Sequence, residues 1–349
     1  MLAAGFPNTA AASSVNRFCS SGLKATADIA HQIANGSIEV GIALGAETMT
    51  VGGDGVEVPF DDEVLKRSQE AQDCMQPMGW TSENVARDFG VTREMMDHYA
   101  AESFDRAEKA QNAGWFDDEI VPITTKVKGP NGETKEVTLI RDEGIRPGTT
   151  AAALGKIRSA FPQWGLTTTG GNASQITDGG SFSARADAPP PPPVDSRSST
   201  APADHPTAAA VVLMKRSKAI KLGVPVMAKY VGSTVSGLAP RIMGIGPVLA
   251  IPKLLAQHNI SLGDVDVVEI NEAFASMAVY CRDKLALDWA KLNPRGGAIA
   301  LGHPLGATGT RQIVTGLSEL RRQKKRLLVT SMCVGTGQGM AGLFVNEQL

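Results

Sequence analysis

The chain has 349 residues and nearly balanced charge, with 34 Lys and Arg against 36 Asp and Glu and a formal net charge of -2. This length suffices for two domains with sizeable cores, and the balance gives no reason to expect a nucleic acid or an anionic membrane as partner. The four cysteines are scattered without a Cys-x-x-Cys pair, which argues against a zinc site and a disulfide framework and fits a reducing compartment. No apolar run approaches the ~20 residues of a membrane span, and no signal pattern opens the sequence, so a soluble protein is expected.

The first informative segment places a thiol where a short polar turn enters a helix. Cys19 follows Val15-Asn16-Arg17-Phe18, and a helix is expected over 20–35 because small apolar residues recur on one face before an Asn-Gly stop. The free N–H groups and the dipole at a helix N-terminus favour a thiolate. We therefore predict that Cys19 has a pKa below the usual ~8.5 and acts as a nucleophile, although a lone cysteine is more often a small core residue. Cys74 and Cys281 are expected to be structural.

The next part of the chain changes character twice. After a strand expected over 40–46, residues 48–172 carry charged helices such as 92–112, an Asn131-Gly132 turn and several Gly or Pro breaks. Most of these charges are interpreted as solvated helical faces. Residues 180–207 then include five consecutive prolines and a Ser/Pro/Asp-rich stretch, which cannot join a sheet and predict a disordered surface loop before a strand at 208–214.

Polar motifs in the second half follow strands or open turns. Asn271-Glu272-Ala273-Phe274 comes after an apolar run at 265–270, Gly302-His303-Pro304 lies in a glycine-rich loop, and Cys333-Val334-Gly335 ends a strand at 327–332. These are the places where an α/β scaffold presents side chains to a substrate. A helix is expected over 308–323, so the order turn, helix, strand occurs in both halves. This repetition predicts two similar α/β halves, with Cys19 from one meeting His303 and Cys333 from the other.

The order and spacing of these motifs resemble the thiolase family, most closely its degradative 3-ketoacyl-CoA members of peroxisomal type. The similarity runs through nearly the whole chain, including the segments 78–86, 142–147 and 243–247. The resemblance implies a thiolase fold, in which two similar α/β halves with mixed sheets are layered with helices and accompanied by a loop domain. The expected first half is 1–218, with the loop domain at about 48–172, and the second half is 219–349.

Two features depart from the family pattern. Family members carry several tens of residues before the cysteine that corresponds to Cys19, so the first half is expected to lack its opening strands. They also run directly from Asp178-Gly179 into Ala208, without the insertion at 180–207. Each lost central strand is a defect of several kcal/mol against a total stability of ~5–15 kcal/mol. A catalytically inactive, truncated thiolase-like chain is therefore an alternative to an enzyme.

The resemblance implies a role for each motif residue. Cys19 would be acylated, His303 would take the proton from Cys19, and Cys333 would protonate the enolate leaving group and later deprotonate the incoming thiol. Asn271 would hold a water that forms one oxyanion site together with His303. The backbone N–H groups of Cys19 and Gly335 would form the second oxyanion site.

Residues that contact coenzyme A are also implied by the resemblance, and none of them would be selected from the sequence alone. Apolar walls, a hydrogen bond to an amide and a phosphate or adenine contact are the tasks that their side chains suit. The expected contacts are Met78, Arg146, Phe161, Ser174, Ala273 and Phe274.

These expectations define a 3-ketoacyl-CoA thiolase of fatty-acid β-oxidation with a ping-pong mechanism. Coenzyme A is a substrate, no metal or redox cofactor is expected, and the expected assembly is a homodimer. The nearest enzyme alternative is a biosynthetic acetoacetyl-CoA thiolase, whereas ketoacyl synthases generally lack the second Cys-x-Gly that Cys333 and Gly335 supply. The resemblance implies a peroxisomal location, with mitochondrion and cytoplasm as alternatives.

Overall fold

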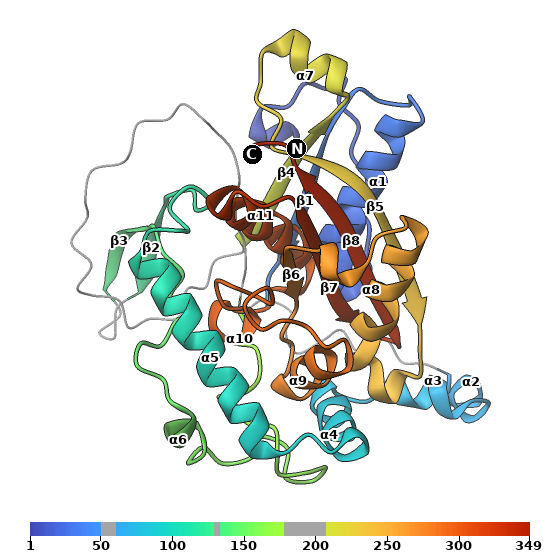
Figure 1. Ribbon diagram of the computed structural model, residues 1–349, viewed down its shortest axis with the longest axis vertical. Coiled ribbons are helices and arrows are strands. Elements are labelled where there is room, and N and C mark those ends of the chain that lie inside the picture. The colour runs from blue at the N-terminus through green and yellow to red at the C-terminus, as the bar shows by residue number, and fades with distance from the viewer. Residues whose placement is uncertain (50–60, 129–132, 178–206) are drawn as a thin grey trace.

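A computed structural model describes residues 1–49, 61–128, 133–177 and 207–349 (Figure 1). The Asn131-Gly132 turn and the Pro-rich insertion expected at 180–207, apart from its last residue, lie outside the described residues. The expectations for these two segments therefore stay predictions.

The first part of the chain contains the expected helices and strands within two residues of their predicted ends. Helix α5 begins where the Thr92 hydroxyl accepts the Met95 N–H at 3.3 Å, a side-chain cap that the sequence pattern indicates. The described elements are 3-10 turns η1 (Leu2–Ala4) and η2 (Phe18–Ser20), α1 (Ser21–Ala34), β1 (Val40–Glu47), α2 (Asp62–Lys66), α3 (Gln69–Asp73), α4 (Met78–Phe89), α5 (Arg93–Asn112), β2 (Ile123–Lys128), β3 (Thr134–Leu139), α6 (Ala151–Leu154), β4 (Thr207–Met214) and α7 (Arg216–Leu222).

The second part of the chain also follows the sequence pattern. Its last helix begins three residues before the expected Thr308, because the turn of His303 and Pro304 leads directly into it. The elements are β5 (Ala228–Gly237), η3 (Pro240–Ile245), α8 (Gly246–Gln257), η4 (Leu262–Asp264), β6 (Val267–Ile270), α9 (Ala275–Lys284), α10 (Ala298–Leu301), α11 (Leu305–Gln323), β7 (Leu327–Val334) and β8 (Gln338–Asn346). Helix α7 runs across the boundary expected at 218/219, which stays a prediction.

The second half is built on a mixed sheet with the strand order β5-β8-β7-β6. Strands β6 and β7 are parallel, and the other pairs are antiparallel. Helix α8 packs against β5, β7 and β8, whereas α11 packs against β6 and β7 from the other side of the sheet (Figure 1). Strands β6 and β7 are buried on both faces, as their largely apolar sequences indicate.

The first half contains a smaller sheet, in which β1 pairs with β4 in antiparallel register. One face carries small residues such as Ala43 and Ala209, which are buried beneath α1 and α11. On the opposite face Ile42 lies beside Val212, and both are exposed together with Leu44. A face so apolar is unusual for a surface exposed to water. The expectation that the first half lacks its opening strands stays a prediction.

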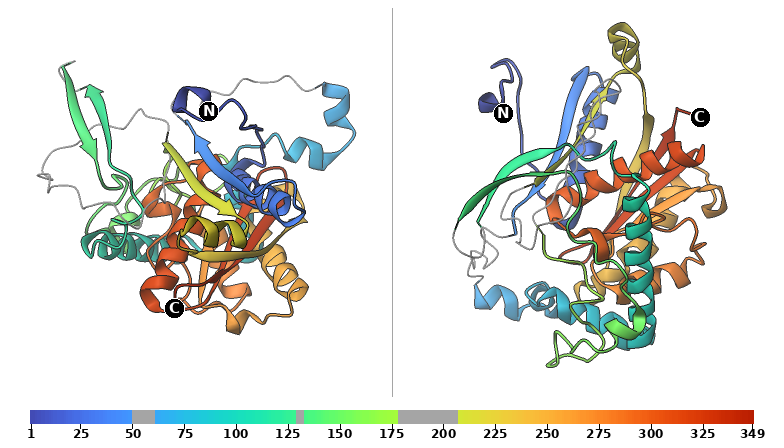
Figure 2. Two further views of the ribbon diagram at one scale, coloured as in Figure 1. Left: turned by 90° about the horizontal axis from the view of Figure 1, so that it is seen from above. Right: turned by 90° about the vertical axis from the view of Figure 1, so that its left-hand side faces the viewer.

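Helices α1 and α11 lie between the two sheets and bring the halves together (Figure 2). Their backbones approach closely where glycines face each other. A Cβ on Gly309 would lie 2.4 Å from the Leu23 nitrogen, and one on Gly22 would lie 2.5 Å from the Thr310 hydroxyl oxygen. Because these glycines carry no side chains, the first turns of the two helices can pack against each other between the sheets.

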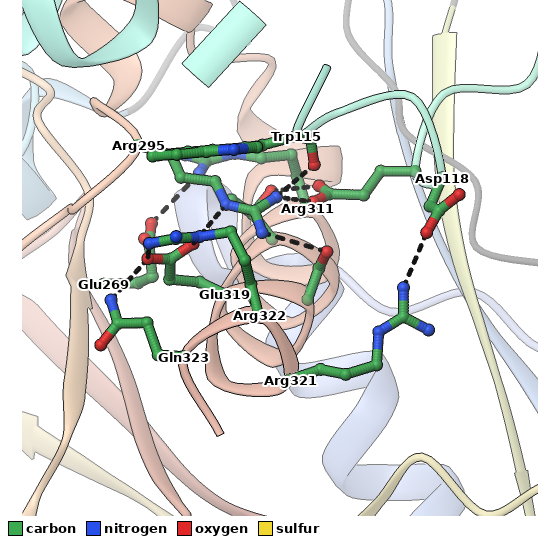
Figure 3. Close-up of polar contacts among 12 residues, drawn as sticks. Trp115, Asp118, Glu269, Arg295, Arg311, Glu319, Arg321, Arg322 and Gln323 are labelled. Carbon is green, nitrogen blue, oxygen red and sulfur yellow. Dashed lines mark hydrogen bonds and ion pairs between the residues drawn. The ribbon is translucent and has the colours of Figure 1, made fainter. Parts of the chain in front are cut away.

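A buried charge cluster ties the segment after α5 to α11 (Figure 3). Arg295 is 1 % exposed; its Nε donates to Glu319 at 2.7 Å, and its Nη1 donates to Glu119 and to the Trp115 carbonyl. The Arg322 guanidinium lies over the Trp115 ring, 3.8 Å from its centroid. Arg295 therefore pairs with two carboxylates, of which Glu319 also pairs with Arg322.

Replacing Arg295 with alanine is expected to lower the free energy of unfolding by about 3–5 kcal/mol, because Glu119 would stay buried without its ion-pair partner and Glu319 would keep only Arg322. The matched control is Arg321→Ala, which removes an exposed ion pair with Asp118 and should cost no more than about 1 kcal/mol. Urea denaturation of both variants measures the difference. Equal losses in the two variants would show that the cluster contributes little.

Candidate active site

The cysteine predicted to be the nucleophile lies in η2, directly before α1. The preceding residue, Phe18, has a positive φ of 46°, which is strained for a bulky side chain. Neighbouring side chains hold this conformation, since Asn16 Oδ1 accepts the Phe18 N–H at 2.8 Å and the Ser21 hydroxyl donates to the Phe18 carbonyl at 2.8 Å. The chain thus turns sharply at the point where it presents Cys19.

The prediction that Cys19 has a lowered pKa is wrong for the resting protein. Burial raises the pKa of its thiol to about 11, and the charge of Glu47 adds to this effect. The backbone groups of Gly335 and Cys19 lower the pKa, but the side chain is only 7 % exposed and desolvation outweighs them. Cys19 is therefore a neutral thiol at physiological pH and needs a proton acceptor to attack a carbonyl.

His303 supplies a proton acceptor in a defined tautomer. Its Nδ1 lies 2.7 Å from the Thr308 hydroxyl oxygen, and that hydroxyl donates to the Pro304 carbonyl at 3.1 Å, so Nδ1 carries the proton. Its Nε2 accepts from the Asn271 amide nitrogen at 3.2 Å. Burial and the charge of Arg311 lower the pKa of His303 to about 3, which keeps the ring neutral.

The second thiol comes from the end of β7. Cys333 is buried, its Sγ lies 3.4 Å from the Met277 sulfur, and burial together with the neighbouring Cys19 raises the pKa of its thiol. Turn η2 packs against both β7 and α11. The structure thus places the turn of Cys19 from the first half beside the strand of Cys333 and the helix that follows His303 in the second half.

Two glycines border this group of residues for different reasons. Gly302 has a φ of 91°, and a Cβ on it would lie 2.3 Å from the Thr177 hydroxyl oxygen, so the bend before His303 requires glycine. A Cβ on Gly335 would reach only ordinary contact with the Phe18 ring at 3.4 Å. A Cβ on Gly335 would thus fit against the Phe18 ring without displacing it.

Three of the expected coenzyme A contacts come together beside this site. The Ser174 N–H donates to the Ala273 carbonyl at 2.9 Å, and Ala173 forms a bridge with Phe274. The next residue, Gln175, accepts the His303 N–H through its carbonyl at 3.1 Å. The segment around Ser174 therefore connects the Asn271 motif with the histidine loop.

The other three expected contacts lie farther out. Met78 is the partly exposed first residue of α4, and the Phe161 ring lies within 2.5 Å of the position that a Cβ on Gly79 would occupy. Phe161 thus packs against Gly79, the residue that follows Met78 in the chain. Arg146 is exposed in the segment after Gly144, and the structure shows no contact between its side chain and the other five expected residues within the described part of the chain.

Sequence reasoning missed residues that hold the site together. Gln175 Nε2 donates to the carbonyls of Gly144, Ile299 and Ala300, so one amide joins three segments, and nothing in the sequence marks it. Thr308 fixes the histidine tautomer. Its position five residues after His303, in the first turn of an expected helix, is a signal that could have found it.

Comparisons with known proteins match this architecture. Residues 1–183 match the model of the thiolase N-terminal domain, and residues 224–346 match that of the thiolase C-terminal domain. The chain is 47 % identical over 347 residues to the peroxisomal 3-ketoacyl-CoA thiolase of Yarrowia lipolytica, covering 99 % of this chain and 77 % of the relative. It is 45 % identical to the human peroxisomal 3-ketoacyl-CoA thiolase over 339 residues, covering 97 % of this chain and 73 % of the relative.

Solved structures give the same result. The dimeric peroxisomal thiolase of Saccharomyces cerevisiae matches with a TM-score of 0.83 at 43 % identity, covering 99 % of this chain and 79 % of the other. Human mitochondrial 3-ketoacyl-CoA thiolase in complex with CoA matches with a TM-score of 0.78 at 34 % identity, covering 99 % and 80 %. The fold is that of a two-domain acyltransferase with a paired-cysteine site. The chain belongs to the thiolase family.

None of the helices within residues 1–49, 61–128, 133–177 and 207–349 combines the length and the apolar character that crossing a membrane requires.

Proposed function

We propose that this chain is a 3-ketoacyl-CoA thiolase of fatty-acid β-oxidation, which cleaves a 3-ketoacyl-CoA with coenzyme A into acetyl-CoA and a shortened acyl-CoA. The observation that carries the proposal is a neutral thiol from one half that is coupled to a second thiol from the other, beside the helix that follows a neutral imidazole with an unprotonated Nε2. The printed names of the relatives at 45–47 % identity support the same activity.

The first half-reaction forms an acyl-enzyme. His303 Nε2 takes the proton of Cys19, and the sulfur attacks the 3-keto carbon, while a water held by Asn271 would form one oxyanion site together with His303. The bond between C2 and C3 then breaks, and the acetyl-CoA enolate takes the proton of Cys333. Because the raised pKa keeps Cys333 protonated, it can serve as the acid in this step.

The second half-reaction releases the product. The Cys333 thiolate removes the proton of the incoming coenzyme A, whose sulfur attacks the thioester on Cys19. The Cys19 sulfur leaves and recovers its proton from the His303 imidazolium. The backbone N–H groups of Cys19 and Gly335, which already face the Cys19 sulfur, would stabilise the thioester oxyanion in both half-reactions.

The family and the relatives also support the other parts of the proposal. Coenzyme A acts as substrate, and the cycle above needs no electron transfer, in keeping with the expectation of no metal or redox cofactor. A homodimer in the peroxisome is supported by the dimeric peroxisomal structure and by the names of the peroxisomal relatives. Met78, Phe161, Ser174, Ala273 and Phe274 would line the path of coenzyme A, and Arg146 would reach its phosphates.

A thiolysis assay over a series of chain lengths tests the function. We expect acetyl-CoA and a shortened acyl-CoA from medium and long 3-ketoacyl-CoA substrates, with the parallel double-reciprocal lines of a ping-pong mechanism. Mass spectrometry of the products is the measurement. Turnover of acetoacetyl-CoA alone would favour the biosynthetic alternative. Coenzyme A binding without turnover of any substrate would favour an inactive thiolase-like chain.

A further inference from the structure

One carboxylate of the first half contacts the histidine loop of the second, and the reaction described above does not use it. Glu47 is the last residue of β1, and its Oε2 accepts the N–H of Gly306 at 3.1 Å. Gly306 is the second residue of α11, and the N-cap residue Pro304 has no side-chain acceptor. Glu47 therefore caps α11 from the other half of the molecule, where the helix dipole favours a negative charge.

The backbones of the same two elements are in direct contact at this point. A Cβ on Gly306 would lie 2.3 Å from the Ala46 carbonyl oxygen, and one on Gly45 would lie 2.3 Å from the Gly306 carbonyl oxygen. Two close approaches and one charged hydrogen bond thus fix the end of β1 to the start of α11. His303 lies only three residues before Gly306, so this junction determines where the imidazole sits.

The same carboxylate also acts on the nucleophile. The charge of Glu47 contributes to the raised pKa of Cys19, and the thiol of Cys333 on β7 is the other titratable group coupled to Cys19. Glu47 is thus close enough to Cys19 for its charge to affect the thiol. Its Oε2 accepts a hydrogen bond from Gly306, just after the loop of His303. Few side chains could affect both partners of the first proton transfer.

We propose that Glu47 is a positioning residue for acyl transfer, which holds the His303 loop at the correct distance from Cys19 across the two halves. This role rests on the proposed thiolysis, whereas the hydrogen bond between Glu47 and Gly306 is present in the structure. The oxygen of Glu47 sets the position, and its charge adds a smaller contribution to that of burial at the Cys19 thiol.

Two substitutions of Glu47 separate the effect of its acceptor oxygen from the effect of its negative charge. Glu47→Ala removes the acceptor and should lower kcat for thiolysis about 10- to 100-fold, with KM for coenzyme A within about twofold, because misplacing a catalytic group by an ångström costs this much. Glu47→Gln keeps an acceptor oxygen and should retain kcat within about fivefold. The matched control is Glu39→Ala, an exposed glutamate directly before β1 that pairs with Lys218 and should leave kcat unchanged.

The pH dependence of Cys19 alkylation by iodoacetamide is a second readout that does not require thiolysis. Both Glu47 variants lack the charge, so their alkylation midpoints should move to lower pH than that of the parent, while the Glu39→Ala midpoint should not move. A Glu47→Ala variant with parental kcat, or a Glu47→Gln variant that loses as much as Glu47→Ala, would overturn the positioning role. Unchanged midpoints would overturn the role of the charge. If the parent shows no thiolysis, the proposed function fails, and the alkylation profile still decides the effect on Cys19.

Discussion

Replacing Cys19 with alanine is expected to abolish both thiolysis and acylation, with a loss of at least ~10⁴-fold in kcat, because removing a covalent nucleophile leaves only the binding and oxyanion contributions. After incubation with acetyl-CoA, mass spectrometry of the parent should find the acetyl group on the peptide that contains Cys19. The substitution removes only a sulfur from a tight turn, so stability should change little.

A matched control for this variant is Cys74→Ala. Cys74 is partly exposed, and its Sγ makes only a weak contact with the Thr336 carbonyl at 4.0 Å. This variant should keep both acylation and turnover. Acetylation found on Cys333 in the parent would show that the roles of the two buried thiols are reversed.

Replacing Cys333 with alanine is expected to separate the two half-reactions. Acylation of Cys19 by acetyl-CoA should continue at a reduced rate, because Cys19 and His303 remain. Claisen condensation and thiolysis should fall about 10²- to 10⁴-fold, since the enolate and the incoming thiol lose the group that exchanges protons with them. Burst acylation in a single-turnover experiment and steady-state turnover measure the two effects separately.

The control for Cys333 is Cys281→Ala, a change of another buried thiol whose Sγ lies 3.8 Å from the Gly244 carbonyl. It should retain both half-reactions, with at most a loss of stability. If Cys333→Ala could not be acylated at all, then Cys333 would be needed to activate Cys19, and His303 would not be sufficient as the base.

The helices and strands were predictable because their signals are local. Apolar residues at helical spacing place α1 within one residue of its expected range at each end, and the mostly apolar run at 327–332 gives most of β7. The thiol of Cys19, the loop of His303 and the end of β7 were predicted to meet because turn, helix and strand occur twice in the same order.

The sign of the Cys19 pKa shift was not predictable from the sequence. Its position before a helix indicated a lowered pKa, but the depth of burial outweighs the nearby N–H groups, and burial is a property of the packed halves. The same holds for the neutral imidazole of His303, which depends on its burial, on Arg311 of α11 and on Asn271.

The sequence by itself determined which residues are chemically able to act and at which ends of strands or helices they lie, because spacing and turn residues fix local structure. Only the tertiary structure decided their protonation and their mutual positions. Gln175 joins three segments and Glu47 bonds to Gly306, 259 residues farther along the chain. Such contacts leave no local pattern, since a hydrogen bond between distant segments depends on how the two halves pack.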